Sequence, residues 1–172
     1  GYIDRNPCDE LRRPSKPRKK INYVTPEQLE KLCRAIEARN DTHGRSDRDL
    51  RWYADVLRFT AGSGLRLGEL CALKWKDVDL ERGAIVVRSD ETHRTKTGEE
   101  RTVYVSPEAQ GILQDIAEER GTADDTFVFQ GPRSDHLSYE LTSRYFRKYR
   151  REAKLPESLT FHSLRKTYGT VL

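Results

Sequence analysis

Methionine is absent from all 172 residues of this sequence, and cysteine is scarce. A chain that opens on Gly1 without an initiator methionine is expected to be a piece of a longer protein. It has no apolar run long enough to span a bilayer and no signal peptide, which argues against a membrane partner. The three cysteines, at positions 8, 33 and 71, show neither metal-ligand spacing nor a disulfide framework. Their scatter favours a reducing cytoplasm.

Charge is plentiful but unevenly distributed. Hydrophobic and charged residues each make up 35% of the chain, which indicates one domain with a polar surface and a modest core. Residues 1–24 and residues 133–154 each hold seven basic residues and three acidic ones, whereas residues 108–125 hold six acidic residues and one arginine. This segregation indicates a face that binds a polyanion. An ordinary solvated helix surface is the alternative.

The organisation along the chain predicts a linker followed by one domain. Residues 1–20 are rich in proline and charge and lack an apolar period, which is typical of an interdomain linker or the tail of a preceding domain. Periodicity and capping residues predict helices over about 26–39, 49–61, 66–74, 106–119 and 138–153, and a last helix after Thr160. Two β-branched runs, 84–88 and 102–105, flank a threonine-rich middle. We read three short antiparallel strands there, the last two joined through residues 97–100. The expected fold of residues 21–172 is a mostly helical α+β domain with a small three-stranded antiparallel sheet.

Arg66 is the first candidate for site chemistry. It follows the glycine-rich break at 62–64 and precedes Glu69 by three residues. An arginine at a helix start behind a flexible turn can offer its planar guanidinium to a phosphate, and Glu69 could hold it in place. A surface ion pair between the two residues is the alternative.

Lys96, His162 and Arg165 are the other candidates. Lys96 lies just before the turn at 97–100, where a hairpin could bring its ammonium into a cleft, although hairpin lysines are usually solubilising. His162 and Arg165 are three residues apart at the start of the last helix, so they share one face while Leu164 points elsewhere. Such a helix start is suited to a phosphate. A structural role for the histidine is the alternative.

The segments GLRLGEL, TKTGEERTVYV and HSLRKT together resemble the catalytic domain of tyrosine recombinases, the phage integrase family. The resemblance covers roughly residues 20–172 in order and spacing. Arg66 and Glu69 are similar to the family's first arginine and the acid that follows it. Lys96 is similar to the family's hairpin lysine, and His162 with Arg165 to its His-x-x-Arg motif. The resemblance therefore implies a site-specific DNA recombinase or integrase, with Glu69 supporting these four catalytic residues.

What the resemblance implies chemically is a transesterification on DNA that uses neither a metal nor a cofactor. A tyrosine hydroxyl attacks the scissile phosphate, forms a 3′-phosphotyrosyl bond and expels a 5′-hydroxyl. Arg66 and Arg165 would stabilise the charge on the non-bridging oxygens. Lys96 would protonate the leaving oxygen, and His162 would assist the proton transfers and hold the phosphate.

The chain departs from the family pattern in two places. A second histidine usually follows the His-x-Leu-Arg motif, but here it is Lys166, a change that we do not expect to abolish function. The family continues for some tens of residues to the nucleophilic tyrosine. We therefore expect the nucleophile beyond residue 172, in a C-terminally incomplete domain, and interpret Tyr168 as a core residue. Asp77 and Asp79 are spaced like a metal-binding pair but are interpreted as turn residues.

Double-stranded DNA is the expected partner, bound mostly through phosphate contacts. The full-length protein is expected to self-associate on DNA as a dimer or tetramer. Tyr145 and Tyr149 should face the core, leaving the basic residues of that helix towards solvent or DNA. The DNA-binding candidates are Lys16, Arg18, Lys19, Lys20, Arg144, Arg147, Lys148 and Arg151. A type IB topoisomerase-like enzyme and a non-catalytic DNA-binding remnant of a recombinase are the alternative functions.

Overall fold

The computed structural model describes residues 22–42, 50–88, 100–132 and 134–171. In these ranges the chain forms six α-helices, one 3₁₀ turn and three short strands. The helices are α1 (Pro26–Thr42), α2 (Arg51–Ser63), α3 (Leu67–Ala72), α4 (Pro107–Arg120), α5 (Tyr139–Glu152) and α6 (Phe161–Val171). The 3₁₀ turn spans Trp75–Asp77, and the strands are β1 (Val78–Asp79), β2 (Ala84–Val87) and β3 (Arg101–Tyr104). The predicted α+β class is confirmed.

The helix starts follow the capping residues that the sequence offers. The backbone N–H of Gln28 donates to Oγ1 of Thr25, and the Gln28 side chain accepts in return from the Thr25 N–H. Ser106 caps α4 by accepting from the N–H of Ala109, and Ser138 caps α5 by accepting from the N–H of Leu141. Because these bonds are local, helix starts could be predicted to within about two residues.

Helix α2 ends two residues later than the sequence predicted, within the glycine-rich segment at 62–64. Gly62 stays inside α2. A Cβ added there would lie 2.3 Å from Oγ of Ser106, so α2 packs closely against the start of α4 at this point. The chain leaves the helix only at Gly64, whose φ of 63° is left-handed. Gly64 therefore turns the chain into α3.

The three strands form one antiparallel sheet in the order β1-β2-β3. Val78 pairs with Ile85, and Val87 pairs with Arg101. Strand β1 was not predicted, because two residues carry no period of their own and the strand exists only through its pairing with β2. The strand expected in the threonine-rich middle lies outside the described residues. The pairing of β3 with β2 places Arg101 within hydrogen-bonding distance of Glu69 on α3.

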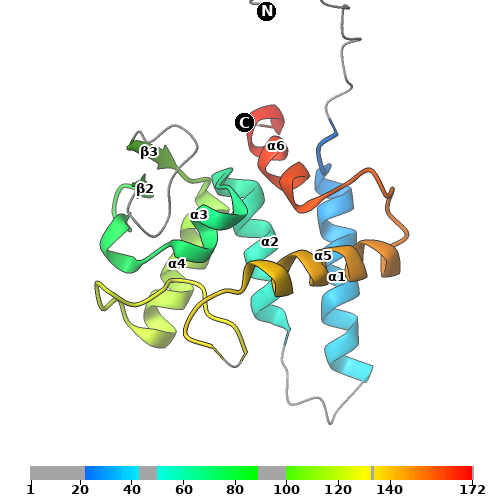
Figure 1. The fold of residues 1–172 in the computed structure, drawn as a ribbon, viewed down its shortest axis with the longest axis horizontal. Coiled ribbons are helices and arrows are strands. Elements are labelled where there is room, and N and C mark those ends of the chain that lie inside the picture. The colour runs from blue at the N-terminus through cyan, green and yellow to red at the C-terminus, as the bar shows by residue number, and fades with distance from the viewer. Residues whose placement is uncertain (1–21, 43–49, 89–99, 133, 172) are drawn as a thin grey trace, which may run out of the picture.

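Helix α2 is the centre of the core. It packs against α1, α4 and α6, and α5 crosses α1 (Figure 1). The side chains of Tyr53, Leu57 and Phe59 are fully buried, and the hydroxyl of Tyr53 donates to the carbonyl of Thr142 on α5 at 2.7 Å. The sheet lies at the opposite end of the molecule from α1 (Figure 1). This packing brings the start of α6 next to the turn between α2 and α3.

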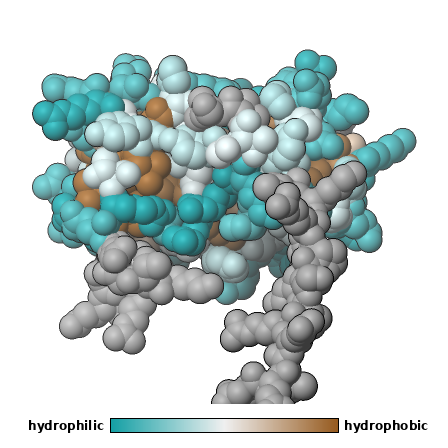
Figure 2. Space-filling view, turned by 90° about the horizontal axis from the view of Figure 1, so that it is seen from above, coloured by the Kyte–Doolittle hydropathy of each residue, from teal (hydrophilic) through white to brown (hydrophobic). Residues whose placement is uncertain are grey.

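The outer surface is predominantly polar. Figure 2 shows one face on which hydrophilic side chains surround small areas of hydrophobic ones. Within the described ranges, Tyr104 and Tyr139 are the large hydrophobic residues that are exposed, at 65% and 54%. No helix in this part of the chain is both long enough and apolar enough to cross a membrane.

Candidate phosphate-binding site

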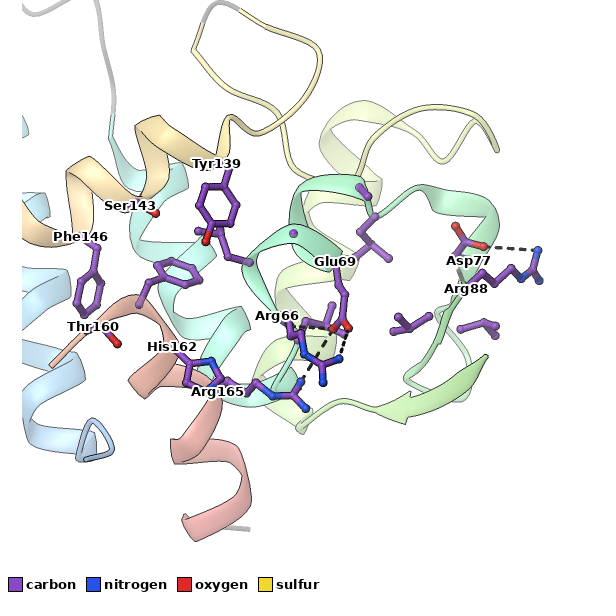
Figure 3. A pocket seen from close by; sticks show the side chains of 18 of the residues that line it. Arg66, Glu69, Asp77, Arg88, Tyr139, Ser143, Phe146, Thr160, His162 and Arg165 are labelled. Atoms are coloured by element: carbon purple, nitrogen blue, oxygen red, sulfur yellow. Dashed lines mark hydrogen bonds and ion pairs between the residues drawn. The ribbon is translucent and has the colours of Figure 1, made fainter. Parts of the chain in front are cut away.

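A cavity of about 900 Å³ lies between α3, β2, α5 and α6. Arg66, Glu69, His162 and Arg165 lie near one another in its middle part, and Asp77 and Arg88 line one end (Figure 3). Tyr139, Ser143 and Phe146 form the wall that α5 contributes (Figure 3). Segments about a hundred residues apart in the sequence therefore share one concave surface.

Arg66 is the N-cap residue of α3 rather than its first helical residue. Its backbone is extended, and its N–H donates to Oε2 of Glu69 at 2.8 Å. Its guanidinium Nη1 donates to Oε1 of the same carboxylate, also at 2.8 Å. The Glu69 side chain is only 10% exposed, although that of Arg66 is 40% exposed, so the carboxylate of this pair is shielded from water, unlike that of a solvated surface ion pair. Glu69 thus fixes both the helix start and the direction of Arg66.

His162 and Arg165 lie on the first turns of α6, as expected from their spacing. Leu164, between them, is fully buried and anchors the helix in the core. The guanidinium Nη1 of Arg165 donates to the carbonyl of Gly64 and lies 4.0 Å from Oε2 of Glu69. Arg165 therefore ties α6 to the turn that precedes Arg66.

The electrostatics of this corner favour an anion. His162 is exposed, but the limited desolvation of its ring lowers its pKa, and the positive charges of Lys166, Arg165 and Arg66 lower it further. Burial also lowers the pKa of Arg165, and the charge of Arg66 adds to that effect. A negative charge placed among His162, Arg165 and Arg66 would offset their mutual repulsion, so this cluster is suited to a bound phosphate.

Glu69 accepts from a third arginine that the sequence analysis did not single out. Arg101, the first residue of β3, donates from Nη1 to Oε1 at 3.0 Å and from Nη2 to Oε2 at 2.6 Å. Burial alone would raise the pKa of Glu69, but the hydrogen bonds from Arg101 and Arg66 outweigh it and the pKa is lowered. Nothing in the local sequence indicated that the side chain of Arg101 reaches Glu69.

The structure brings together three of the four predicted catalytic residues, Arg66, His162 and Arg165. Lys96 and the candidate DNA-binding residues Lys16, Arg18, Lys19 and Lys20 lie outside the described residues.

Helix α5 carries the remaining candidates for DNA binding. Arg144, Arg147 and Arg151 are exposed. Lys148 is half-buried, with its ammonium 5.2 Å from the ring centroid of Tyr149. Arg147 also lines the cavity, so the basic surface of α5 is continuous with the candidate phosphate site.

The expectations for the tyrosines hold with one correction. Tyr149 is fully buried, and Tyr145 is half-buried against the core. Tyr168 is half-buried rather than a core residue, because its ring lies against Gly64 at the edge of the molecule while its hydroxyl donates to the carbonyl of Tyr104 at 2.6 Å. Its role is to fasten α6 to β3.

The two aspartates differ in their surroundings. Asp79 accepts from the N–H of Arg82 at 3.0 Å, which matches the turn role expected for it. Asp77 lies in the 3₁₀ turn, lines the cavity and pairs with Arg88 at 3.6 Å. In the part of the chain that the structure describes, no three His, Cys, Asp or Glu side chains are grouped as metal ligands would be.

Comparison with known proteins identifies similar chains. Residues 22–172 match the model of the phage integrase family. The tyrosine recombinase XerC of Xanthomonas axonopodis pv. citri is 33% identical over 132 residues, which cover 76% of this chain and 38% of the relative. The tyrosine recombinase XerA of Pyrococcus furiosus is 29% identical over 168 residues, covering 95% and 52%. The chain thus spans about half or less of the length of these curated relatives.

Solved structures agree with the fold. A crystal structure of XerA recombinase has a TM-score of 0.64 and 25% identity, covering 94% of this chain and 54% of that one. The catalytic core of lambda integrase also has a TM-score of 0.64, at 22% identity, covering 87% and 82%.

Proposed function

The chain belongs to the phage integrase family, and we propose that it is the catalytic domain of a site-specific recombinase that cleaves and rejoins double-stranded DNA. The observation that carries this proposal is the convergence of Arg66, His162 and Arg165 in the lining of one cavity. The family match says nothing of side-chain placement in this chain, and local sequence does not enforce it. Residues 1–20 would then be the linker to a preceding domain, and the protein would act in the cytoplasm.

The roles follow from the positions of the charges. Arg66 and Arg165 bind the non-bridging oxygens of the scissile phosphate and stabilise the charge that grows there. His162 lies beside both arginines and assists the proton transfers while it helps to hold the phosphate. Lys96 protonates the leaving 5′ oxygen, a role that rests on the family motif alone.

The attacking group is a tyrosine hydroxyl that forms a 3′-phosphotyrosyl bond, and we place it beyond residue 172. Two contacts support this. The hydroxyl of Tyr168 already donates a hydrogen bond to the carbonyl of Tyr104, and the ring of Tyr168 packs against Gly64. Freeing this hydroxyl for attack would unfasten α6 from β3.

DNA would lie across α5 and the mouth of the cavity. The exposed guanidinia of Arg144, Arg147 and Arg151 supply phosphate contacts. Each contact steepens the slope of log binding constant against log salt concentration by about 0.9. Self-association on DNA is proposed for the longer protein.

The test has two stages, because the target sequence is unknown. A randomised duplex pool is first enriched for DNA that the chain binds. Each phosphate of the enriched duplex is then replaced, one at a time, by a neutral methylphosphonate. We expect one phosphate whose neutralisation weakens binding of the unaltered chain at least tenfold but has little further effect on the Arg66→Met/Arg165→Met variant.

A matched control is Arg82→Met, which removes a positive charge from an exposed pair with Asp79. This variant should still respond to the same methylphosphonate. If the double variant responds to every methylphosphonate as the unaltered chain does, no phosphate lies between Arg66 and Arg165 and the proposed function is wrong.

A further inference from the structure

Arg101 contacts the candidate site from outside the cavity. Glu69 lines the cavity, whereas Arg101 does not. The strand β3 nevertheless directs the Arg101 guanidinium at both carboxylate oxygens of Glu69, at 3.0 Å and 2.6 Å. This two-point geometry is the strongest form of an arginine–carboxylate pair.

The same carboxylate also serves the two arginines that face the cavity. It accepts from the Arg66 guanidinium at 2.8 Å and lies 4.0 Å from that of Arg165. Three guanidinia therefore surround one carboxylate that is only 10% exposed. The cluster carries a net charge of two positive units, of which both face the cavity because the bidentate pair with Arg101 is neutral.

Two positive charges match the chemistry that the proposed function requires. A phosphodiester carries one negative charge, and attack by an ionised hydroxyl adds a second in the transition state. Without Arg101, the negative charge of Glu69 would have to be balanced by Arg66 or Arg165. Only one uncompensated guanidinium would then remain for the phosphate.

We propose that Arg101 is a positioning residue of the phosphate site, which neutralises Glu69 from behind so that Arg66 and Arg165 keep their full charge for the anion. This inference rests on the proposed function, since it needs an anion held between those two arginines. The competing explanation is mechanical: the ion pair would only fasten the sheet to α3.

Sulfate binding to the 172-residue chain separates the two explanations, because sulfate keeps the same charge across the working pH range. Isothermal titration would compare the unaltered chain with Arg101→Met, Arg101→Lys and the double variant Arg101→Met/Glu69→Gln. We expect Arg101→Met to weaken sulfate binding about tenfold, the size of one charged hydrogen bond. Arg101→Lys keeps the charge and should stay within about threefold of the unaltered chain.

The double variant is the decisive one. It lacks the ion pair altogether but restores a net charge of two, so we expect it to bind sulfate more tightly than Arg101→Met, with part of the affinity still lost because an amide holds Arg66 less firmly than the Glu69 carboxylate does. A merely mechanical role predicts that the double variant binds as weakly as Arg101→Met, and that result would overturn the proposal. Far-UV circular dichroism at the titration temperature establishes that each variant is folded.

Two further variants distinguish failure of this inference from failure of the proposed function. Arg66→Met should weaken sulfate binding, and Arg82→Met should not. If Arg66→Met has no effect, sulfate does not bind at this site and the proposed function itself loses its support. If Arg66→Met weakens binding but Arg101→Met does not, the phosphate site stands and only the role of Arg101 is overturned.

Discussion

Replacing Gly64 with alanine should destabilise the fold by about 3 kcal/mol, because two penalties coincide at this residue. Its φ of 63° is left-handed, which costs an L-residue with a side chain roughly 1–2 kcal/mol. An added Cβ would also lie 2.8 Å from Cδ1 and 2.9 Å from Cγ of Tyr168. The ring must move, and displacing it endangers the hydrogen bond from its hydroxyl to Tyr104, which is worth about 1 kcal/mol.

Thermal unfolding followed by circular dichroism measures this loss. For a chain of this size, about 3 kcal/mol corresponds to a fall in Tm of roughly 6–12 °C. Gly111→Ala on α4 is the matched control, because an added Cβ there meets no atom within 4 Å. Alanine is the better helix former, so the control should gain about 0.5–1 kcal/mol.

A double-mutant cycle with Tyr168→Ala separates the two penalties. With the ring removed, Gly64→Ala should cost only the backbone strain of roughly 1–2 kcal/mol. If the glycine substitution costs the same with and without Tyr168, or leaves Tm unchanged, the ring of Tyr168 does not pack against Gly64.

Two pH-dependent predictions follow from the site. Urea unfolding should show that lowering the pH from 6 to 3 reduces the unfolding free energy of the unaltered chain more than it reduces that of the Glu69→Gln variant. Burial opposes the lowered pKa of Glu69, but the hydrogen bonds from Arg101 and Arg66 prevail. The stability from ionised Glu69 is complete above its unfolded pKa of about 4.3 and is lost as pH falls through its lower folded pKa; equal losses would contradict this. The pKa of His162 should lie below 6.5 in an NMR titration, because of limited desolvation of its ring and then of the charges of Lys166, Arg165 and Arg66. A histidine pKa that is lowered in the folded state means that stability falls as the pH drops below 6.5. Replacing Lys166 with glutamine should raise the midpoint of the His162 titration, and an unmoved midpoint would show that the Lys166 charge does not lower this pKa.

Much of the secondary structure could be predicted from the sequence because its causes are local. Thr25, Ser106 and Ser138 cap their helices through bonds to residues three positions away. The strand β1 escaped prediction for the opposite reason, since Val78 and Asp79 are extended only because β2 pairs with them. The late end of α2 likewise depends on the close contact of Gly62 with Ser106.

The candidate site divides in the same way. The sequence by itself determined the candidates, since Arg66 with Glu69 and His162 with Arg165 are pairs at helical spacing. Only the tertiary structure decided that the pairs meet, through a bond from Arg165 to Gly64 that joins positions 101 residues apart. It also decided that Arg101 backs Glu69 across 32 residues and that Tyr168 fastens α6 to β3 across 64. Periodicity and caps report on neighbours within about four residues, whereas these contacts depend on how buried faces pack together, which no short stretch of sequence specifies.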